Sequence, residues 1–520
     1  MSAVTVVTAK EGASGSAKPT GVDLRSWHTP ELVIALCGPI GSPLHDVAAK
    51  LEEHLDRTHG YKCRTIRLSK FIDDIQGAPP AGASPFEKAK WRIDKGNALR
   101  EKFGASVLAD LAIRQIANQR ERSKPEESKE YKPDRVCHII DSIKNREELE
   151  TLRLVYRDLL FTVGVFGSLQ AREANLRASR MELSEVYQLI DRDSGEEKDF
   201  GQTVREIFPR ADYFVRVDGD SAASMDSRLE RLLSLLFDLR VTTPTVAETG
   251  MYHAAAAARN SACLSRQVGA AIVDDDGRLI SIGWNDVPCF GGSVYRLNGS
   301  AGDRENDHRC YNLKSRCESD RERFEIAERT VDAIVSDLAS QGIAMTAAKK
   351  DRLVNVVLKS SIGSLLEFSR ALHAEMHAIL SAAVPVRNTT LYCTTYPCHP
   401  CARFITAAGI KEVRYIEPYR KSLAIKLHGD AMCEDEKDKT KVRILPFDGV
   451  APTRYLELFG MSENSRKDET GAAYHRAASV APPKCESTLE SLPVMEGLVV
   501  AKLAEKKVPT VSAQSGATDA

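Results

Sequence analysis

The sequence predicts two α/β units joined by a connecting helix. In the first half, apolar strand candidates alternate with amphipathic helices, which is typical of a mainly parallel sheet. In the second half, a helix–strand–helix–strand pattern surrounds a group of metal-ligating side chains. A Gly-, Ser- and Asp-rich segment at 218–226 separates the halves and predicts a domain edge. A length of 520 residues also favours several units over one.

Composition narrows the class of protein. The net charge is −1, so the chain lacks the overall basic character of many nucleic-acid-binding proteins. No apolar run reaches the roughly 18 residues needed to span a bilayer, and we expect no membrane association. Twelve cysteines are too few for a disulfide scaffold in a chain of this length, which favours the reducing cytoplasm. Residues 1–28 and 462–520 lack periodicity, and we expect both to be disordered tails.

The first unit is expected over residues 29–218. An apolar run at 31–37 predicts a buried parallel strand, and a Gly-rich turn and an amphipathic helix at 46–55 follow it. Further strands are expected at 63–68, 135–140, 159–166 and 213–217, with helices at 91–118 and 146–157.

The turn after the first strand resembles a phosphate-binding loop. Gly38, Gly41 and Ser42 lie between strand and helix, which is the layout of such loops. However, Pro43-Leu44-His45 stands where the motif G-x-x-x-x-G-K-[ST] has its second glycine, lysine and hydroxyl. Asp141 ends a later strand, in the place of a Mg²⁺-supporting aspartate. Three interpretations stay open: a tight turn in a sheet, a nucleotide site without hydrolysis, or an active kinase or NTPase.

Residues 219–246 are expected to form a connecting helix and a hinge, and residues 247–461 the second unit. This unit begins with an Ala-rich helix and a hairpin whose turn carries the Asp-Gly signature. Residues 287–368 form an insertion, for which a lid over the substrate or an oligomer contact is expected. Its side chains His308, Cys310 and Cys317 are either a second, structural zinc site or buried and free thiols.

The strongest motif lies between residues 371 and 401. His373, Cys398 and Cys401 supply one imidazole and two thiolates, a ligand set for Zn²⁺ that leaves a fourth position for water. Glu375 follows the histidine at a distance that leaves it free to move protons. The spacing H-A-E followed by P-C-x-x-C is the signature of zinc-dependent base deaminases, in which Zn²⁺ lowers the pKa of water.

Together, these segments resemble the bacterial anti-phage deoxycytidylate deaminases that carry an N-terminal P-loop nucleotide kinase-like domain. The matching segments are GPIGS at 38–42, Asp141-Ser-Ile-Lys-Asn, Arg192-Asp193 with Gly201-Gln202, the run MYHAAAAARNSACLSRQVGAAIVDDDGRLISIGWNDVP, the zinc motif and a P-Y-x-K-S-like stretch from 418. The resemblance implies deamination of dCMP and dCTP, which drains the dCTP that a phage needs. It also implies a cytoplasmic homo-oligomer held inactive until infection, with a small regulatory RNA as a candidate inhibitor.

The resemblance also implies roles for individual residues. Asn285 would contact the deoxyribose, and Arg172 and Arg180 would contact phosphate, although surface arginines are the alternative. Near the pocket, Tyr419, Lys421 and Ser422 offer donors that suit phosphate, or belong to a solvated loop. Thr395 is a candidate for orienting the ring.

Two other functions remain open. One is a deaminase that edits tRNA or DNA, which would need a basic, aromatic-lined approach to its pocket. The other is a regulated nucleotide- or RNA-binding module whose working part is the first half.

Overall fold

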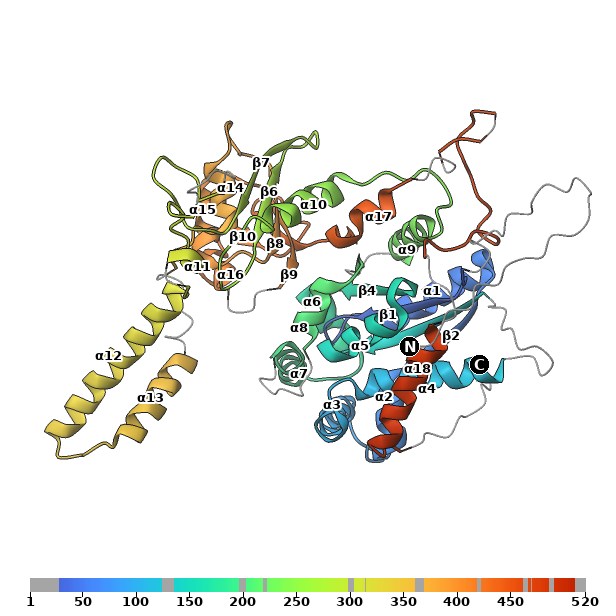
Figure 1. Ribbon diagram of the computed structural model, residues 1–520, viewed down its shortest axis with the longest axis horizontal. Helices are drawn as coiled ribbons and strands as arrows, with labels where there is room; N and C mark the ends of the chain where they lie inside the picture. The colour runs from blue at the N-terminus through green and yellow to red at the C-terminus, as the bar shows by residue number, and fades with distance from the viewer. Residues whose placement is uncertain are drawn as a thin grey trace, which may run out of the picture.

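The computed structural model describes residues 28–123, 135–195, 203–217, 222–297, 304–313, 315–360, 369–418, 422–461, 466–468, 470–485 and 491–509. Within them the chain forms two six-stranded sheets with helices packed around each (Figure 1). The predicted α/β fold class is therefore confirmed. We refer to residues 28–217 as the N-terminal unit and to residues 246–461 as the C-terminal unit.

The first sheet is mainly parallel. Its order is β12-β5-β4-β1-β3-β2, and all neighbours among the five N-terminal strands run parallel. Every residue of the central strand β1 is buried, as expected when helices cover both faces of a parallel sheet. The strands are β1 (Leu32–Cys37), β2 (Lys62–Arg67), β3 (Val136–Ile143), β4 (Leu160–Phe166), β5 (Tyr213–Arg216) and β12 (Gly449–Val450).

Helices connect these strands in the predicted order. They are α1 (Leu44–His59), α2 (Leu68–Gln76), α3 (Pro85–Phe103), α4 (Val107–Arg122), α5 (Arg146–Tyr156), α6 (Leu169–Ala178), α7 (Leu183–Gly195) and α8 (Val204–Ile207), followed by the connecting helix α9 (Ala222–Leu236). The helical region predicted at 91–118 is confirmed, but it consists of two helices. Gly104, whose φ of 106° an L side chain rarely adopts, separates α3 from α4.

The second sheet is mixed. Its order is β10-β11-β9-β8-β6-β7, with β6 antiparallel to both β7 and β8 and the remaining neighbours parallel. The strands are β6 (Gly269–Val273), β7 (Leu279–Trp284), β8 (Thr390–Thr395), β9 (Glu412–Glu417), β10 (Met432–Cys433) and β11 (Val442–Pro446). The helices are α10 (Val246–Ala258), α14 (Ala374–Leu380), α15 (His399–Ala407), α16 (Ala424–His428) and α17 (Tyr455–Phe459).

One hydrophobic cluster contains buried residues of both units. Strand β12 belongs to the C-terminal unit but pairs with β5 of the first sheet. Beside it, the buried Glu248 of α10 accepts hydrogen bonds from Val450 N (3.0 Å) and Arg231 Nη2 (2.6 Å). Because strand β12 crosses the boundary and Arg454 of the C-terminal unit pairs with Asp212 of the N-terminal unit at 3.8 Å, the two units pack as one body.

The insertion contains α11 (Cys310–Leu313), α12 (Glu318–Ser340) and α13 (Ala347–Lys359). The last two form a hairpin that projects away from both sheets (Figure 1). A small cluster of Ala327, Val331 and Val354 packs between them.

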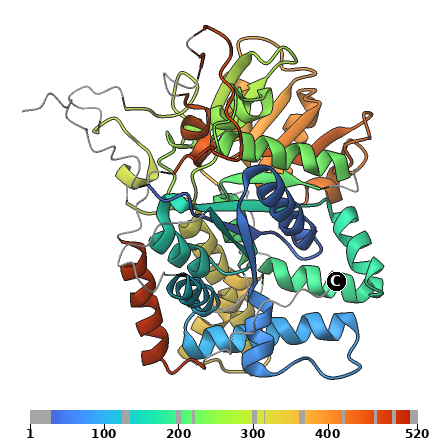
Figure 2. The same ribbon diagram turned by 90° about the vertical axis from the view of Figure 1, so that its right-hand side faces the viewer.

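The C-terminal segment corrects one expectation. Part of the predicted disordered tail forms α18 (Leu492–Glu505), which packs against α4 along one flank of the N-terminal unit (Figure 2). The buried Glu496 pairs with Arg120 of α4 at 3.1 Å, and Arg120 also pairs with Glu31 at 2.6 Å. The prediction failed because the helix is held by tertiary contacts rather than by a strong amphipathic pattern. None of the described helices is long and apolar enough to cross a membrane.

Candidate metal centre and its cavity

Two helix starts bring the three predicted metal ligands together. His373 is the N-cap of α14, and Cys398 is the N-cap of α15, with Cys401 one turn further on. His373 Nδ1 lies 3.1 Å from Cys398 Sγ and 3.4 Å from Cys401 Sγ. Both cysteines are buried, and the candidate ligand atoms of the three residues all lie within 4.8 Å of one another.

This arrangement fits a zinc ion. With Zn–N and Zn–S bonds of ordinary length at a tetrahedral angle, nitrogen and sulfur ligands are about 3.6 Å apart. The separations of 3.1 and 3.4 Å differ from that by only a few tenths of an ångström. The three residues can therefore hold Zn²⁺ and leave a fourth position open.

The helix that carries His373 and Glu375 is set directly on the second sheet. A Cβ at Gly283 of β7 would lie 2.3 Å from Ala378 N and 2.4 Å from Ala374 O, so only glycine allows this close approach. On the same helix, the buried His377 accepts a hydrogen bond at Nδ1 from the backbone N–H of Trp284 (3.1 Å). These contacts with β7 fix the position of α14, and with it the positions of His373 and Glu375.

The electrostatics of the site favour a thiolate at Cys398 and a carboxyl group at Glu375 that can gain and lose a proton near neutral pH. A hydrogen bond from Cys401 and contact with His373 lower the pKa of Cys398 to about 4. The hydrogen bond with Cys398 raises the pKa of His373 to about 9, and burial raises that of Glu375 to about 7. Zinc ligands bind as thiolates and neutral imidazole. Metal binding therefore releases the protons that His373 and the two cysteines hold in the absence of the ion.

His373 and Cys398 of the metal-binding group line a cavity of about 720 Å³. Glu375, Asn285 and Thr395 also line it, as the sequence predicted for residues near a substrate. A volume of this size suits a small organic ligand. Four arginines of the lining had no predicted role: Arg205, Arg266, Arg323 and Arg370. Arg370 lies three residues before His373 and Arg266 lies in the run that resembles the opening of deaminases, whereas Arg205 and Arg323 belong to no motif that the sequence reveals.

The side-chain amide of Asn285 is hydrogen-bonded to the backbone of the segment before β6. Its Oδ1 accepts a hydrogen bond from Val268 N at 2.7 Å, and its Nδ2 donates to Arg266 O at 2.9 Å. These bonds shape the loop that borders the cavity.

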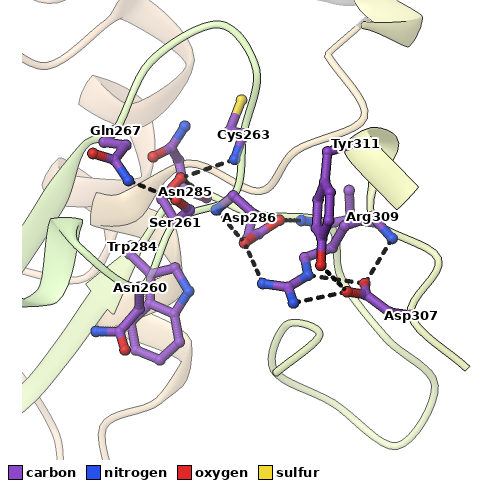
Figure 3. A network of polar contacts seen from close by, with 12 residues as sticks. Asn260, Ser261, Cys263, Gln267, Trp284, Asn285, Asp286, Asp307, Arg309 and Tyr311 are labelled. Carbon is purple, nitrogen blue, oxygen red and sulfur yellow. Dashed lines mark hydrogen bonds and ion pairs between the residues drawn. The ribbon is translucent and has the colours of Figure 1, made fainter. Parts of the chain in front are cut away.

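Beside Asn285 a buried polar network joins the insertion to the cavity wall (Figure 3). Arg309 pairs with Asp307 at 2.8 Å and with Asp286 at 3.6 Å, and the Tyr311 hydroxyl donates to Asp307 at 2.8 Å. Asp286, which follows Asn285, also accepts hydrogen bonds from Ala262 N and from its neighbour's backbone N–H. The base of the insertion is therefore tied to the loops that form the cavity.

Two further predicted site residues contact the strand and the loop beside the metal centre. Thr395 donates to Glu417 at 3.4 Å, and Ser422 donates to the carbonyl oxygen of Pro397 at 2.7 Å, beside the first cysteine ligand. Tyr419 and Lys421 fall outside the described residues.

The structure does not gather His308, Cys310 and Cys317 into a second metal site. Among the residues that the structure describes, only the His373 group brings three such ligands close together. Instead, Cys310 Sγ accepts from Arg370, and Cys317 Sγ lies 3.4 Å from Ser265 Oγ. Of the two interpretations left open by the sequence, the structure therefore favours free thiols at Cys310 and Cys317.

Basic side chains donate hydrogen bonds to the backbone carbonyl groups of the P-loop-like turn. Lys144 Nζ donates to Gly38 O at 2.9 Å, and Arg172 Nε donates to Ile40 O at 2.8 Å. Asp141, buried within β3, pairs with His45. These contacts involve the carbonyl groups of the turn, whereas phosphate binding uses its N–H groups.

Of the other predicted residues at this turn, Gly41 has a φ of 85°, which favours glycine. The Ser42 hydroxyl is buried, and Arg180 is exposed beyond the end of α6.

The geometry defines a buried His-Cys-Cys metal centre with a carboxylate beside it, in a cavity rich in arginine. Residues 244–417 match the family model described as the cytidine and deoxycytidylate deaminase zinc-binding region. The C-terminal unit therefore contains a deaminase zinc-binding region, and its cofactor is Zn²⁺.

Relatives and solved structures resemble parts of the chain. The deoxycytidylate deaminase of Enterobacteria phage T4 is 28% identical over 167 residues, which are 32% of this chain and 74% of that protein. The dCMP deaminase of cyanophage S-TIM5, solved with dCMP and dUMP, is 18% identical and covers 39% of this chain and 98% of its own, with a TM-score of 0.21. A gluconokinase from Sinorhizobium meliloti 1021 is 15% identical and covers 39% of this chain and 95% of its own, with a TM-score of 0.23. Both TM-scores are too low to carry an assignment.

Proposed function

We propose that this protein is a zinc-dependent hydrolytic deaminase of free deoxycytidine nucleotides, which converts dCMP and dCTP to dUMP and dUTP. The observation that carries the proposal is the meeting of three features in one cavity. These are the His373–Cys398–Cys401 group, the buried Glu375 and several arginines. The first two suit attack on a base, and the arginines suit a phosphorylated substrate.

Glu375 is the proton carrier of the proposed reaction. Bound Zn²⁺ would supply an activated water molecule beside it. Glu375 takes a proton from this water, whose oxygen adds to C4 of cytosine, and delivers the proton to N3. It then passes the second proton of the water to the exocyclic amine. The C4–N bond breaks, ammonia leaves, and a carbonyl remains at C4, so one water is consumed for each base.

A substrate panel tests the proposal. Purified protein with added zinc is incubated with dCMP, dCTP, CMP, CTP and single-stranded DNA, and the products are separated by chromatography. We expect uracil products from the free deoxynucleotides. Deamination of DNA alone would instead support the editing function, against which the near-zero net charge argues.

We also propose that depletion of dCTP by this enzyme protects a bacterial host against phage. The support is the resemblance of both halves to anti-phage deaminases, since a drained dCTP pool would slow phage DNA synthesis. Infected cells that express the wild type should contain less dCTP than infected cells that express Glu375→Ala. Equal pools in the two strains would exclude this role.

A further inference from the structure

Arg205 is unusual among the residues that line the metal cavity, because it comes from the N-terminal unit. The other lining residues lie between positions 262 and 398, in the C-terminal unit. Arg205 lies on the short helix α8, far from the metal motif in the sequence.

The packing of α8 at the junction of the two units fixes this position. Val204 and Ile207 on either side of Arg205 are buried, and the turn Phe208–Arg210 that follows contacts β9 of the second sheet. A second, small cavity between the units is lined by Arg205 and Phe208 from one side and by Tyr415 from the other. Arg205 therefore stands where the N-terminal unit meets the metal cavity.

Arg205 also differs from the other lining arginines in its polar contacts. Arg266 pairs with Glu417, Arg323 with Asp320, and Arg370 donates to the carbonyl oxygen of His308. Arg205 makes no hydrogen bond or ion pair with any residue in the described part of the chain. A half-buried guanidinium without a carboxylate partner is suited to bind an anionic ligand.

We infer that Arg205 binds the phosphate chain of the nucleotide, so that the N-terminal unit completes the substrate site of the deaminase. This inference rests on the proposed function. With the base held beside Glu375 and the metal group, the phosphates extend towards the part of the cavity that Arg205 lines. The N-terminal unit then acts as a wall of the active site and determines specificity for phosphorylated substrates.

Binding to a catalytically silent full-length protein tests the inference. Zinc-loaded Glu375→Ala protein, with and without Arg205→Ala, is titrated calorimetrically with dCTP, dCMP and deoxycytidine. Loss of a hydrogen bond to a charged group costs about 1.5–3 kcal/mol, so we expect dCTP to bind roughly 10- to 100-fold more weakly without Arg205. Deoxycytidine should bind equally to both proteins, and Arg205→Lys should restore part of the dCTP affinity.

Arg210→Ala provides the matched control. Arg210 lies five residues further along the same segment, pairs with Glu150 and does not line the cavity. Its loss should leave dCTP affinity unchanged. Equal dCTP affinity with and without Arg205, or an equal loss for deoxycytidine, would overturn the inference while leaving the deaminase proposal intact. If the Glu375→Ala protein binds no nucleotide and the wild type shows no turnover, both proposals fail together.

Discussion

Replacing Arg309 by leucine should loosen the insertion from the cavity wall. The change leaves Asp286 and Asp307 buried, at 1% and 4% exposure, without the guanidinium that joins them (Figure 3). Removing one partner of a buried ion pair costs about 3–5 kcal/mol. The leucine side chain has a similar apolar body, so the loss is mainly electrostatic.

The magnitude can be worked from Asp307 separately. Its bonds with Arg309 hold the pKa of Asp307 at about 2, compared with an ordinary value of 3.8. A pKa lowered by this amount corresponds to about 2–3 kcal/mol of stabilisation from Asp307. Detachment of residues 304–313 from the cavity wall would expose the unpaired carboxylates to water. The loss of global stability therefore cannot exceed the free-energy cost of that local opening.

The effect should depend on pH with a definite sign. In the wild type the depressed pKa makes Asp307 stabilising above pH 4, and this contribution disappears as the pH falls towards 2. In the variant the hydrogen bonds from Arg309 that lower the pKa of Asp307 are absent, so this pH-dependent contribution is lost. The stability difference between the two proteins should therefore be full at pH 7.5 and should narrow as the pH falls from about 4 towards 2.

Hydrogen exchange over 304–313, with urea unfolding at each pH, measures both parts of this prediction. Arg304→Leu is the control, because Arg304 is exposed on the same segment. A difference below about 1 kcal/mol at pH 7.5, or one that stays constant as the pH falls, would refute the reasoning.

Three further predictions concern the metal centre and the C-terminal helix. Glu375→Ala should retain zinc by metal analysis while turnover falls by roughly 10²- to 10⁴-fold, and retained deamination would exclude its role as proton carrier. Cys398→Ser should lose both zinc and activity, whereas full zinc content would show that the ion is held elsewhere. Glu496→Ala leaves Arg120 with Glu31 alone and should cost up to about 3–5 kcal/mol. It should also make α18 sensitive to limited proteolysis, and unchanged protease resistance would show that the apolar face of the helix suffices.

The sequence by itself determined the chemistry of the metal centre. His373, Glu375, Cys398 and Cys401 could be predicted because two helix starts place the ligands at fixed local spacings, and such spacings are visible along the chain. The buried parallel strands were predictable for a similar reason, because a continuous apolar run such as that of β1 indicates a strand that is buried on both faces.

Only the tertiary structure decided what surrounds that centre. Arg205 lines the cavity because the turn Phe208–Arg210 that follows α8 packs against β9. Helix α18 is held in place because Glu496 pairs with Arg120, which is distant in the sequence. Conversely, the possible second metal motif of His308, Cys310 and Cys317 is not assembled among the described residues, because Cys310 and Cys317 contact Arg370 and Ser265 instead. These features depend on contacts between distant segments, which leave no periodic or local pattern for a sequence to reveal.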